Sequence, residues 1–174
     1  ESLYKSNNLA RINFEEYIHK LVSGLFSSYG IDENIIKTKM DLDKIRLNID
    51  TAIPLGLILN ELISNSLKHA FPQYNQNYKN NIFANQVIES NTPLNVHFTH
   101  PEEIKGEITI SLLQDDDMLK LVVGDNGIGF PENVNFRNTE SLGLQLVNTL
   151  VDQLKGEIKL EKDNGTKFTL NLKK

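Results

Sequence analysis

Asp125-Asn126-Gly127-Ile128-Gly129 is the stretch on which the interpretation of this sequence depends. It follows the apolar run 118–123, which is typical of a β-strand, so a carboxylate stands at a strand end beside two glycines. Glycines let a flat ligand approach the backbone closely, and a carboxylate accepts hydrogen bonds without donating any. The stretch therefore predicts a site for the exocyclic amine of adenine, and for ATP over GTP. The alternative is a β-hairpin turn, which Asn-Gly between apolar runs also favours.

The length and composition describe a single domain, residues 1–174. A chain of this size buries roughly two thirds of its unfolded surface without disulfides. It has no cysteine, which fits a cytoplasmic location, and no run of about 18 apolar residues. A net charge of −5 with scattered lysines argues against a nucleic-acid partner. Because the first residue is Glu1, we expect a piece of a longer protein, and membrane anchoring of the full-length protein stays open.

Apolar spacing predicts helices that alternate with pairs of strands. The predicted order is a helix from Asn13 to Phe26, a hairpin of 36–42 and 45–49, a helix capped by Asp50-Thr51 with Pro54 in its first turn and Ala70 at its end, a hairpin of 107–113 and 118–123, a helix over 142–154, and a hairpin of 157–161 and 167–172. One half-apolar face per strand implies a two-layer α/β (α+β) sandwich, in which helices cover one face of a mixed sheet.

Residues 73–105 differ in character from the rest of the chain. Asn and Gln dominate residues 73–91, and a connection this long is uncommon inside a compact domain. We predict a mobile insertion with little chemistry of its own. The alternative is that Phe83, Val87 and Ile88 dock on the body of the domain.

The second predicted helix carries three polar residues, Glu61, Asn65 and Lys68, at positions i, i+4 and i+7. At helical spacing they share one face, opposite the apolar stripe. An amide oxygen suits Mg²⁺, an ammonium balances phosphate charge, and a carboxylate can orient a nucleophile. The alternative is a solvated face with a Glu-Lys pair.

The third predicted helix begins at residues 139–144 with small hydroxyl residues and a glycine. Free N–H groups and the helix dipole at such a start favour a phosphate. Equally, Thr139 or Ser141 is an ordinary N-cap and Gly143 only allows close packing. In the final hairpin, Thr166 could reach the base through water, or Gly165 simply serves the turn.

Four segments together resemble the sequence boxes of the GHKL ATPases. Residues 60–70 resemble the N box, 125–130 the G1 box, 141–144 the G2 box, and Gly165-Thr166 the last glycine box. The resemblance is to the ATP-binding domain of sensor histidine kinases and implies the Bergerat fold, whose sheet is mostly antiparallel. The loop between Gly129 and Gly143 is short and has no clear F box.

Among those kinases, the sequence Lys68-His69-Ala70-Phe71 is similar to the HWE-related group, although the chain has no tryptophan and so stands beside that group. The resemblance implies Mg-ATP as the bound cofactor and Asn65 as the Mg²⁺ ligand. Glu61 is implied as the catalytic group that polarises the acceptor imidazole. The residues implied to bind the nucleotide are Asn65, Lys68, His69, Asp125, Gly127, Ile128, Gly129, Leu142, Gly143, Leu144 and Thr166.

The function implied is transfer of the γ-phosphoryl group of ATP to a histidine. That histidine is expected on a dimerisation domain upstream in the same polypeptide, because the histidines here (His19, His69, His97 and His100) do not follow the acceptor pattern. A homodimer and a response regulator receiver domain are the expected partners. One alternative is an ATPase that drives a clamp, with Glu61 activating water. Another is a module that binds nucleotide without turnover.

Overall fold

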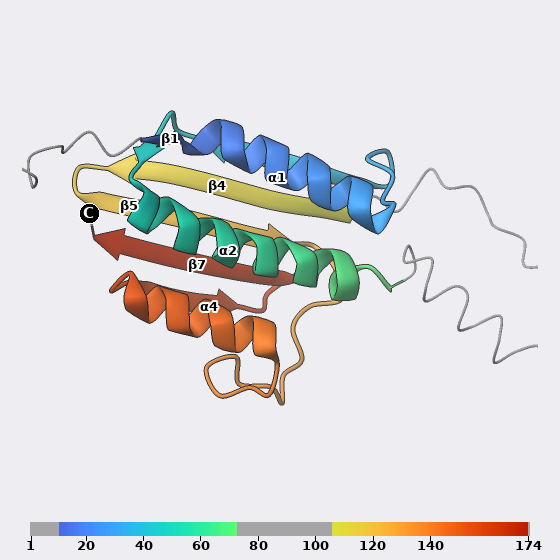
Figure 1. Ribbon diagram of the computed structural model, residues 1–174. Helices are drawn as coiled ribbons and strands as arrows, with labels where there is room; N and C mark the ends of the chain where they lie inside the picture. Colours follow the sequence, from blue (N-terminus) through green and yellow to red (C-terminus); the bar gives the residue numbers. More distant parts are fainter. Residues whose placement is uncertain (1–10, 73–105, 174) are drawn as a thin grey trace, which may run out of the picture.

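The computed structural model describes residues 11–72 and 106–173, which form a two-layer sandwich. One layer is a five-stranded sheet in the order β2-β4-β5-β7-β6, and the helices α1, α2 and α4 lie on one of its faces (Figure 1). The strands are β2 (Ile36–Leu42), β4 (Gly106–Asp115), β5 (Met118–Asp125), β6 (Glu157–Glu161) and β7 (Thr166–Lys173). β2 and β4 run parallel, and the other neighbours in this sheet run antiparallel. The predicted mixed, mostly antiparallel sheet with helices on one face is confirmed.

Asparagine caps set the starts of the first two helices. Asn13 begins α1 (Phe14–Tyr29) as predicted, and its side chain accepts the N–H of Glu16 at 3.4 Å. α1 continues three residues beyond the predicted end, to Tyr29, and is closed by Gly30, whose φ of 61° suits a glycine. Asn48 begins α2 (Ile49–Asn65), and its Oδ1 accepts the N–H of Thr51 at 2.8 Å.

The predicted cap of α2 by Asp50-Thr51 is therefore wrong. Asn48 is as good an N-cap as Asp and comes earlier in the chain, so Asp50 lies in the first turn and Pro54 in the second. An acidic residue in the first turn complements the helix dipole. The third helix, α4 (Leu142–Gln153), and the closing hairpin of β6 and β7 agree with the prediction.

The predicted hairpin of residues 36–42 and 45–49 is also wrong, because its two strands have different partners. β2 pairs with β4, whereas the short β3 (Arg46–Leu47) pairs with β1 (Ile12–Asn13) in a separate sheet. Asp43 explains the separation, since its Oδ2 accepts the N–H of Gln114 on β4 at 2.8 Å. This bond holds the end of β2 along β4, so the chain does not fold back on β2. The predicted insertion 73–105 lies outside the described residues.

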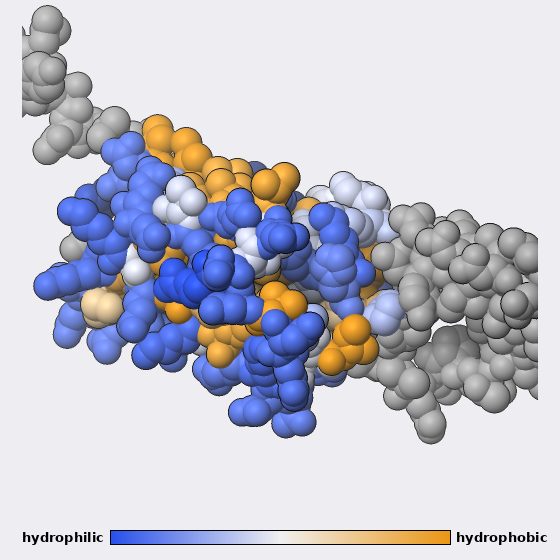
Figure 2. Space-filling view, turned by 90° about the horizontal axis from the view of Figure 1, so that it is seen from below, coloured by the Kyte–Doolittle hydropathy of each residue, from blue (hydrophilic) through white to orange (hydrophobic). Residues whose placement is uncertain are grey.

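The core lies between the helices and the sheet. The predicted apolar stripe of α2 is buried, with Leu55, Leu59 and Ile63 fully enclosed. The sheet contributes fully buried residues to the same cluster, among them Ile108, Ile110, Leu112 and Leu121. The outer side of α2 keeps apolar residues at the surface, since Ile53 is 56% and Leu57 43% exposed. Figure 2 shows hydrophobic surface along the edge of the molecule where the helices lie.

The described residues on either side of segment 73–105 lie close together. A Cβ added at Gly106 would lie 2.8 Å from the ring of Phe71, and the N–H of Gly106 donates to Ile35. We predict that replacing Gln73–Glu103 by a short Gly-Ser bridge preserves the fold, because a short connection spans neighbouring ends. The deletion variant should melt cooperatively, with a midpoint within about 4 °C of the full chain. Loss of the cooperative melt would show that the segment belongs to the core.

Candidate functional site

A pocket opens where the C-terminal end of α2 meets the end of β5. Its volume is about 480 Å³, within the range of roughly 300–1,000 Å³ that is usual for small-molecule sites. The lining comes from five parts of the described chain: the end of α2 with the π-helical turn η1 (Ser66–Ala70), the end of β5, the loop that follows it, the start of α4, and β7. The lining residues are Leu62, Asn65, Ser66, His69, Ala70, Asp125, Ile128, Gly129, Phe130, Pro131, Val134, Thr139, Ser141, Leu144, Thr166 and Phe168.

Many residues predicted from the sequence line this pocket, and some lie beside it. Those that line it are Asn65, His69, Asp125, Ile128, Gly129, Leu144 and Thr166. Gly127 lies behind the lining, against Ala70, and Leu142 is 80% exposed. Glu61 points its carboxylate at the backbone of Gly143, where an added Cβ would contact Oε2.

The carboxylate of Asp125 is held by donors from three segments of the chain. Its Oδ2 accepts the hydroxyl of Ser66 at 2.7 Å. Its Oδ1 accepts the backbone N–H groups of Gly127 at 3.1 Å and Thr166 at 3.3 Å. A carboxylate offers about four acceptor positions, so about one stays available, on Oδ2. The group can therefore receive one donor from a ligand while its orientation stays fixed.

Two glycines permit the close contacts around this carboxylate. A Cβ at Gly127 would overlap the backbone of Ala70, whose carbonyl accepts the N–H of Ile128 at 2.9 Å. A Cβ at Gly165 would overlap the carbonyl of Asp125, and the φ of Gly165 is +114°. Both contacts involve backbone atoms, which cannot move aside as a flexible side chain can. Gly127 and Gly165 therefore allow close packing between chain segments beside the pocket.

The turn η1 separates the polar residues that were expected to share one face of α2. A π-helical turn closes between residues five apart, so it holds more residues than an α-helical turn and rotates later residues backward. Asn65 and His69 both line the pocket. Lys68 turns toward α1, where its Nζ lies 5.8 Å from the ring centroid of Tyr29. Single π-turns of this kind are frequent at functional sites.

The start of α4 has backbone N–H groups that donate no hydrogen bond to the side chain of its N-cap residue. Ser141 is the N-cap residue, but its side chain makes no capping hydrogen bond. Thr139 instead accepts the N–H of Ser141 at 3.1 Å. The sequence left open whether these hydroxyls cap the helix, and the structure gives them other positions, on the lining of the pocket. First-turn N–H groups without a capping side chain are available to an anion.

Several lining residues were not predicted from the sequence. Ser66 was missed. The residue is only 7% exposed, so its hydroxyl needs a hydrogen-bond partner, and that partner is Asp125. Phe130 and Phe168 were missed because apolar residues carry no chemical signal. Their rings meet edge to face at 6.1 Å between centroids. They supply an apolar wall that suits a flat ring.

The residues present can contribute to a Mg²⁺ site without forming one alone. Within residues 11–72 and 106–173, no group of three or more His, Asp or Glu converges on a cation position. The amide of Asn65 lines the pocket and offers a hard oxygen ligand. Mg²⁺ commonly takes one or two protein ligands together with substrate phosphates and water. The donor set thus fits an ion that arrives with a nucleotide.

None of the described helices has the length and apolar character needed to cross a bilayer.

Comparisons with known proteins agree with this geometry. A family model described as histidine kinase-, DNA gyrase B-, and HSP90-like ATPase matches residues 50–174. The chain is 26% identical over 166 residues to the sensor histidine kinase PdtaS of Mycobacterium tuberculosis, and the match covers 93% of this chain and 27% of PdtaS. The chain therefore spans about a quarter of that relative.

Solved structures share the fold. The histidine kinase domain of the Erythrobacter litoralis blue-light-activated kinase EL346 superposes with a TM-score of 0.69 at 22% identity, covering 93% of this chain and 61% of that one. The catalytic domain of histidine kinase ThkA superposes with a TM-score of 0.64 at 17% identity, covering 94% of each chain. The fold is thus the Bergerat fold expected from the sequence boxes.

We predict that Gly127→Ala destabilises the protein, because the new methyl group meets the backbone of Ala70. Overpacking of this kind costs about 1–3 kcal/mol in the free energy of unfolding, which denaturant titration would measure. Gly24→Ala is the matched control, since nothing lies within 4 Å of a Cβ there and alanine favours a helix by about 1 kcal/mol. Equal stability of the two variants would contradict the close contact at Gly127.

Proposed function

The chain belongs to the family of histidine kinase-, DNA gyrase B-, and HSP90-like ATPases, and we propose that it is the ATP-binding catalytic domain of a sensor histidine kinase. The observation that carries the proposal is the Asp125 carboxylate, oriented by Ser66, Gly127 and Thr166 at the pocket wall. The name of PdtaS as a sensor histidine kinase, with a match over most of this chain, supports the kinase branch of the family.

In this proposal the free acceptor position of Asp125 receives the exocyclic amine of adenine. A carbonyl oxygen at the same place, as in guanine, would face a carboxylate and find no donor there. Apolar side chains line the pocket at Ile128, Phe130 and Phe168, and the base can lie against them. The site is thereby selective for adenine nucleotides.

The phosphates lie, in the same proposal, between η1 and the start of α4. The Asn65 amide oxygen ligates the Mg²⁺ that accompanies the nucleotide, and His69 contacts ribose or phosphate. Lys68 neutralises phosphate charge after leaving the Tyr29 ring. The N–H groups at Leu142, Gly143 and Leu144 close over the triphosphate. Because phosphoryl transfer depends on positioning and charge neutralisation, these groups carry most of the catalytic effect.

The phosphoryl acceptor in this proposal is a histidine on a dimerisation domain elsewhere in the same polypeptide. Glu61 polarises the acceptor imidazole from its position beside Gly143, at the mouth of the phosphate region. A response regulator receiver domain then takes the phosphoryl group from the histidine. The full-length protein acts as a homodimer, with this domain in the cytoplasm.

Asp125→Asn tests the adenine contact. We expect loss of ATP binding in a folded protein, because the amide presents its own N–H₂ to the adenine amine. Calorimetric titration with ATP would measure the affinity, and Asp117→Asn, at an exposed position just before the same strand, is the control. Near wild-type affinity in folded Asp125→Asn would refute the adenine-carboxylate contact.

Glu61→Ala separates kinase from hydrolase. We expect the isolated chain to hydrolyse ATP very slowly, because the site positions an imidazole from another domain and does not hold water in line. A polypeptide that includes the histidine-bearing helices should become phosphorylated in an acid-labile, base-stable form. Glu61→Ala should reduce this phosphorylation more than it weakens ATP binding. Asn65→Ala, in contrast, should lose Mg²⁺-dependent binding and activity together. Brisk phosphate release by the isolated chain, abolished by Glu61→Ala, would support an ATP-driven clamp instead.

A further inference from the structure

The loop 130–141 forms one wall of the pocket, and side chains from outside the loop hold its backbone at three places. Phe130, Pro131, Val134 and Thr139 of the loop line the pocket. We propose that Asn148 and Gln145 on α4, together with Lys162 in the turn after β6, are positioning residues that keep this loop in its nucleotide-binding shape. The proposal rests on the proposed function, because it treats the pocket as the nucleotide site.

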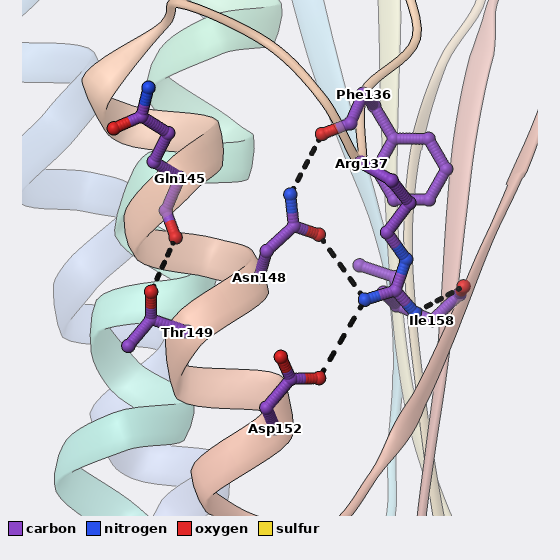
Figure 3. Close-up of polar contacts among 7 residues, drawn as sticks. All are labelled: Phe136, Arg137, Gln145, Asn148, Thr149, Asp152 and Ile158. Carbon is purple, nitrogen blue, oxygen red and sulfur yellow. Dashed lines mark hydrogen bonds and ion pairs between the residues drawn. The ribbon is translucent and has the colours of Figure 1, made fainter.

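Asn148 makes the central contact (Figure 3). Its Nδ2 donates to the carbonyl of Phe136 at 2.8 Å, and its Oδ1 accepts from the guanidinium of Arg137 at 3.4 Å. The side chain is partly buried between the helix and the loop. One amide group thus engages two successive loop residues, which fixes both the position and the direction of the backbone there.

Arg137 extends the same contact to the sheet. Its guanidinium donates to the carbonyl of Ile158 on β6 at 3.4 Å and lies 3.8 Å from the carboxylate of Asp152 on α4. Figure 3 shows Arg137 between the helix and the strand, with Asn148 and Asp152 on one side and Ile158 on the other. The middle of the loop is therefore held to two different elements, α4 and β6.

The two ends of the loop are held in the same manner. Gln145 donates through Nε2 to the carbonyl of Thr139 at 2.8 Å. Lys162 donates through Nζ to the carbonyl of Pro131 at 2.9 Å. All these acceptors are main-chain carbonyls, so the contacts set the path of the backbone. Because Pro131 and Thr139 themselves line the pocket, that path sets the shape of the wall.

Aromatic contacts complete the attachment of the loop to the sheet. The ring of Phe136 meets Phe168 edge to face at 5.6 Å between centroids, and Phe130 meets the same ring at 6.1 Å. Phe168 is on β7 and lines the pocket. The loop is thus packed on its apolar side and hydrogen-bonded on its polar side.

A loop held in this way lowers the cost of binding. If only a fraction of molecules has the binding-competent loop, the apparent Kd rises in inverse proportion to that fraction. Removing donors that hold the loop should lower the competent fraction without touching any atom of the nucleotide. The role is distinguishable from general destabilisation, because an unfolded fraction lowers the number of sites in a titration and leaves the Kd of the folded molecules unchanged.

The test uses the double variant Gln145→Ala/Asn148→Ala and the single variant Asn148→Asp. Asp keeps the shape and the acceptor toward Arg137 but removes the donor to Phe136. We expect faster hydrogen exchange in peptides that cover residues 130–141 of both variants, measured without nucleotide. In calorimetric titration with Mg-ATP, the double variant should show a Kd raised about tenfold, with the wild-type number of sites, because it loses two donors to loop carbonyls and one acceptor for Arg137.

Thr149→Ala is the matched control, since the Thr149 hydroxyl donates to the carbonyl of Gln145 within α4 and does not touch the loop. It should bind and exchange like the wild type. The exposed single variant Gln145→Ala replaces the double variant if that variant does not fold, with a smaller rise in Kd expected. Unchanged loop exchange and unchanged Kd would overturn the positioning role. Failure of the wild type to bind nucleotide would instead overturn the proposed function, while the exchange measurement still decides whether these side chains hold the loop.

Discussion

The close approach of Gly127 to Ala70 is the contact on which the site depends. With no side chain at Gly127, the chain after β5 lies directly against the end of η1, and Ile128 donates to the Ala70 carbonyl at 2.9 Å. This contact brings Ser66 within hydrogen-bonding distance of Asp125. A methyl group between the two backbones would separate the helical layer from the sheet at the point where the pocket forms. The missing side chain therefore has a structural reason, in addition to access for a ligand.

Local signals made most of the fold predictable. Helix periodicity, strand alternation and short polar turns are encoded within a few residues, and they predicted the helices and two antiparallel hairpins. The partner of β2 was not predictable in this way. Alternation marks a strand but not its neighbour, and β2 pairs with β4, which lies beyond segment 73–105. The start of α2 was misplaced because Asn48 and Asp50 are similar capping residues.

The sequence predicted several of the residues that line the pocket, but not how they are arranged there. Asp125, Asn65 and Thr166 line the pocket. They were predictable because each lies in a short motif, and the motifs follow one another in a fixed order along the chain. The prediction that Asn65 and Lys68 share one face assumed α-helical spacing. The π-turn places Lys68 elsewhere, and nothing in the local sequence specifies the extra residue in that turn. The loop anchors escaped prediction for a different reason. Asn148 bonds a backbone carbonyl, and main-chain acceptors leave no mark in the sequence.

The three donors to Asp125 make the site part of the protein's own folding equilibrium. They come from residues 66, 127 and 166, so the carboxylate is oriented only when these distant segments have assembled. A ligand that binds this arrangement and not the unfolded chain raises the free energy of unfolding by mass action. At a ligand concentration 100 times Kd the gain is about 2.7 kcal/mol. The concentration of nucleotide would then set how stable the folded domain is against unfolding, apart from any phosphoryl transfer.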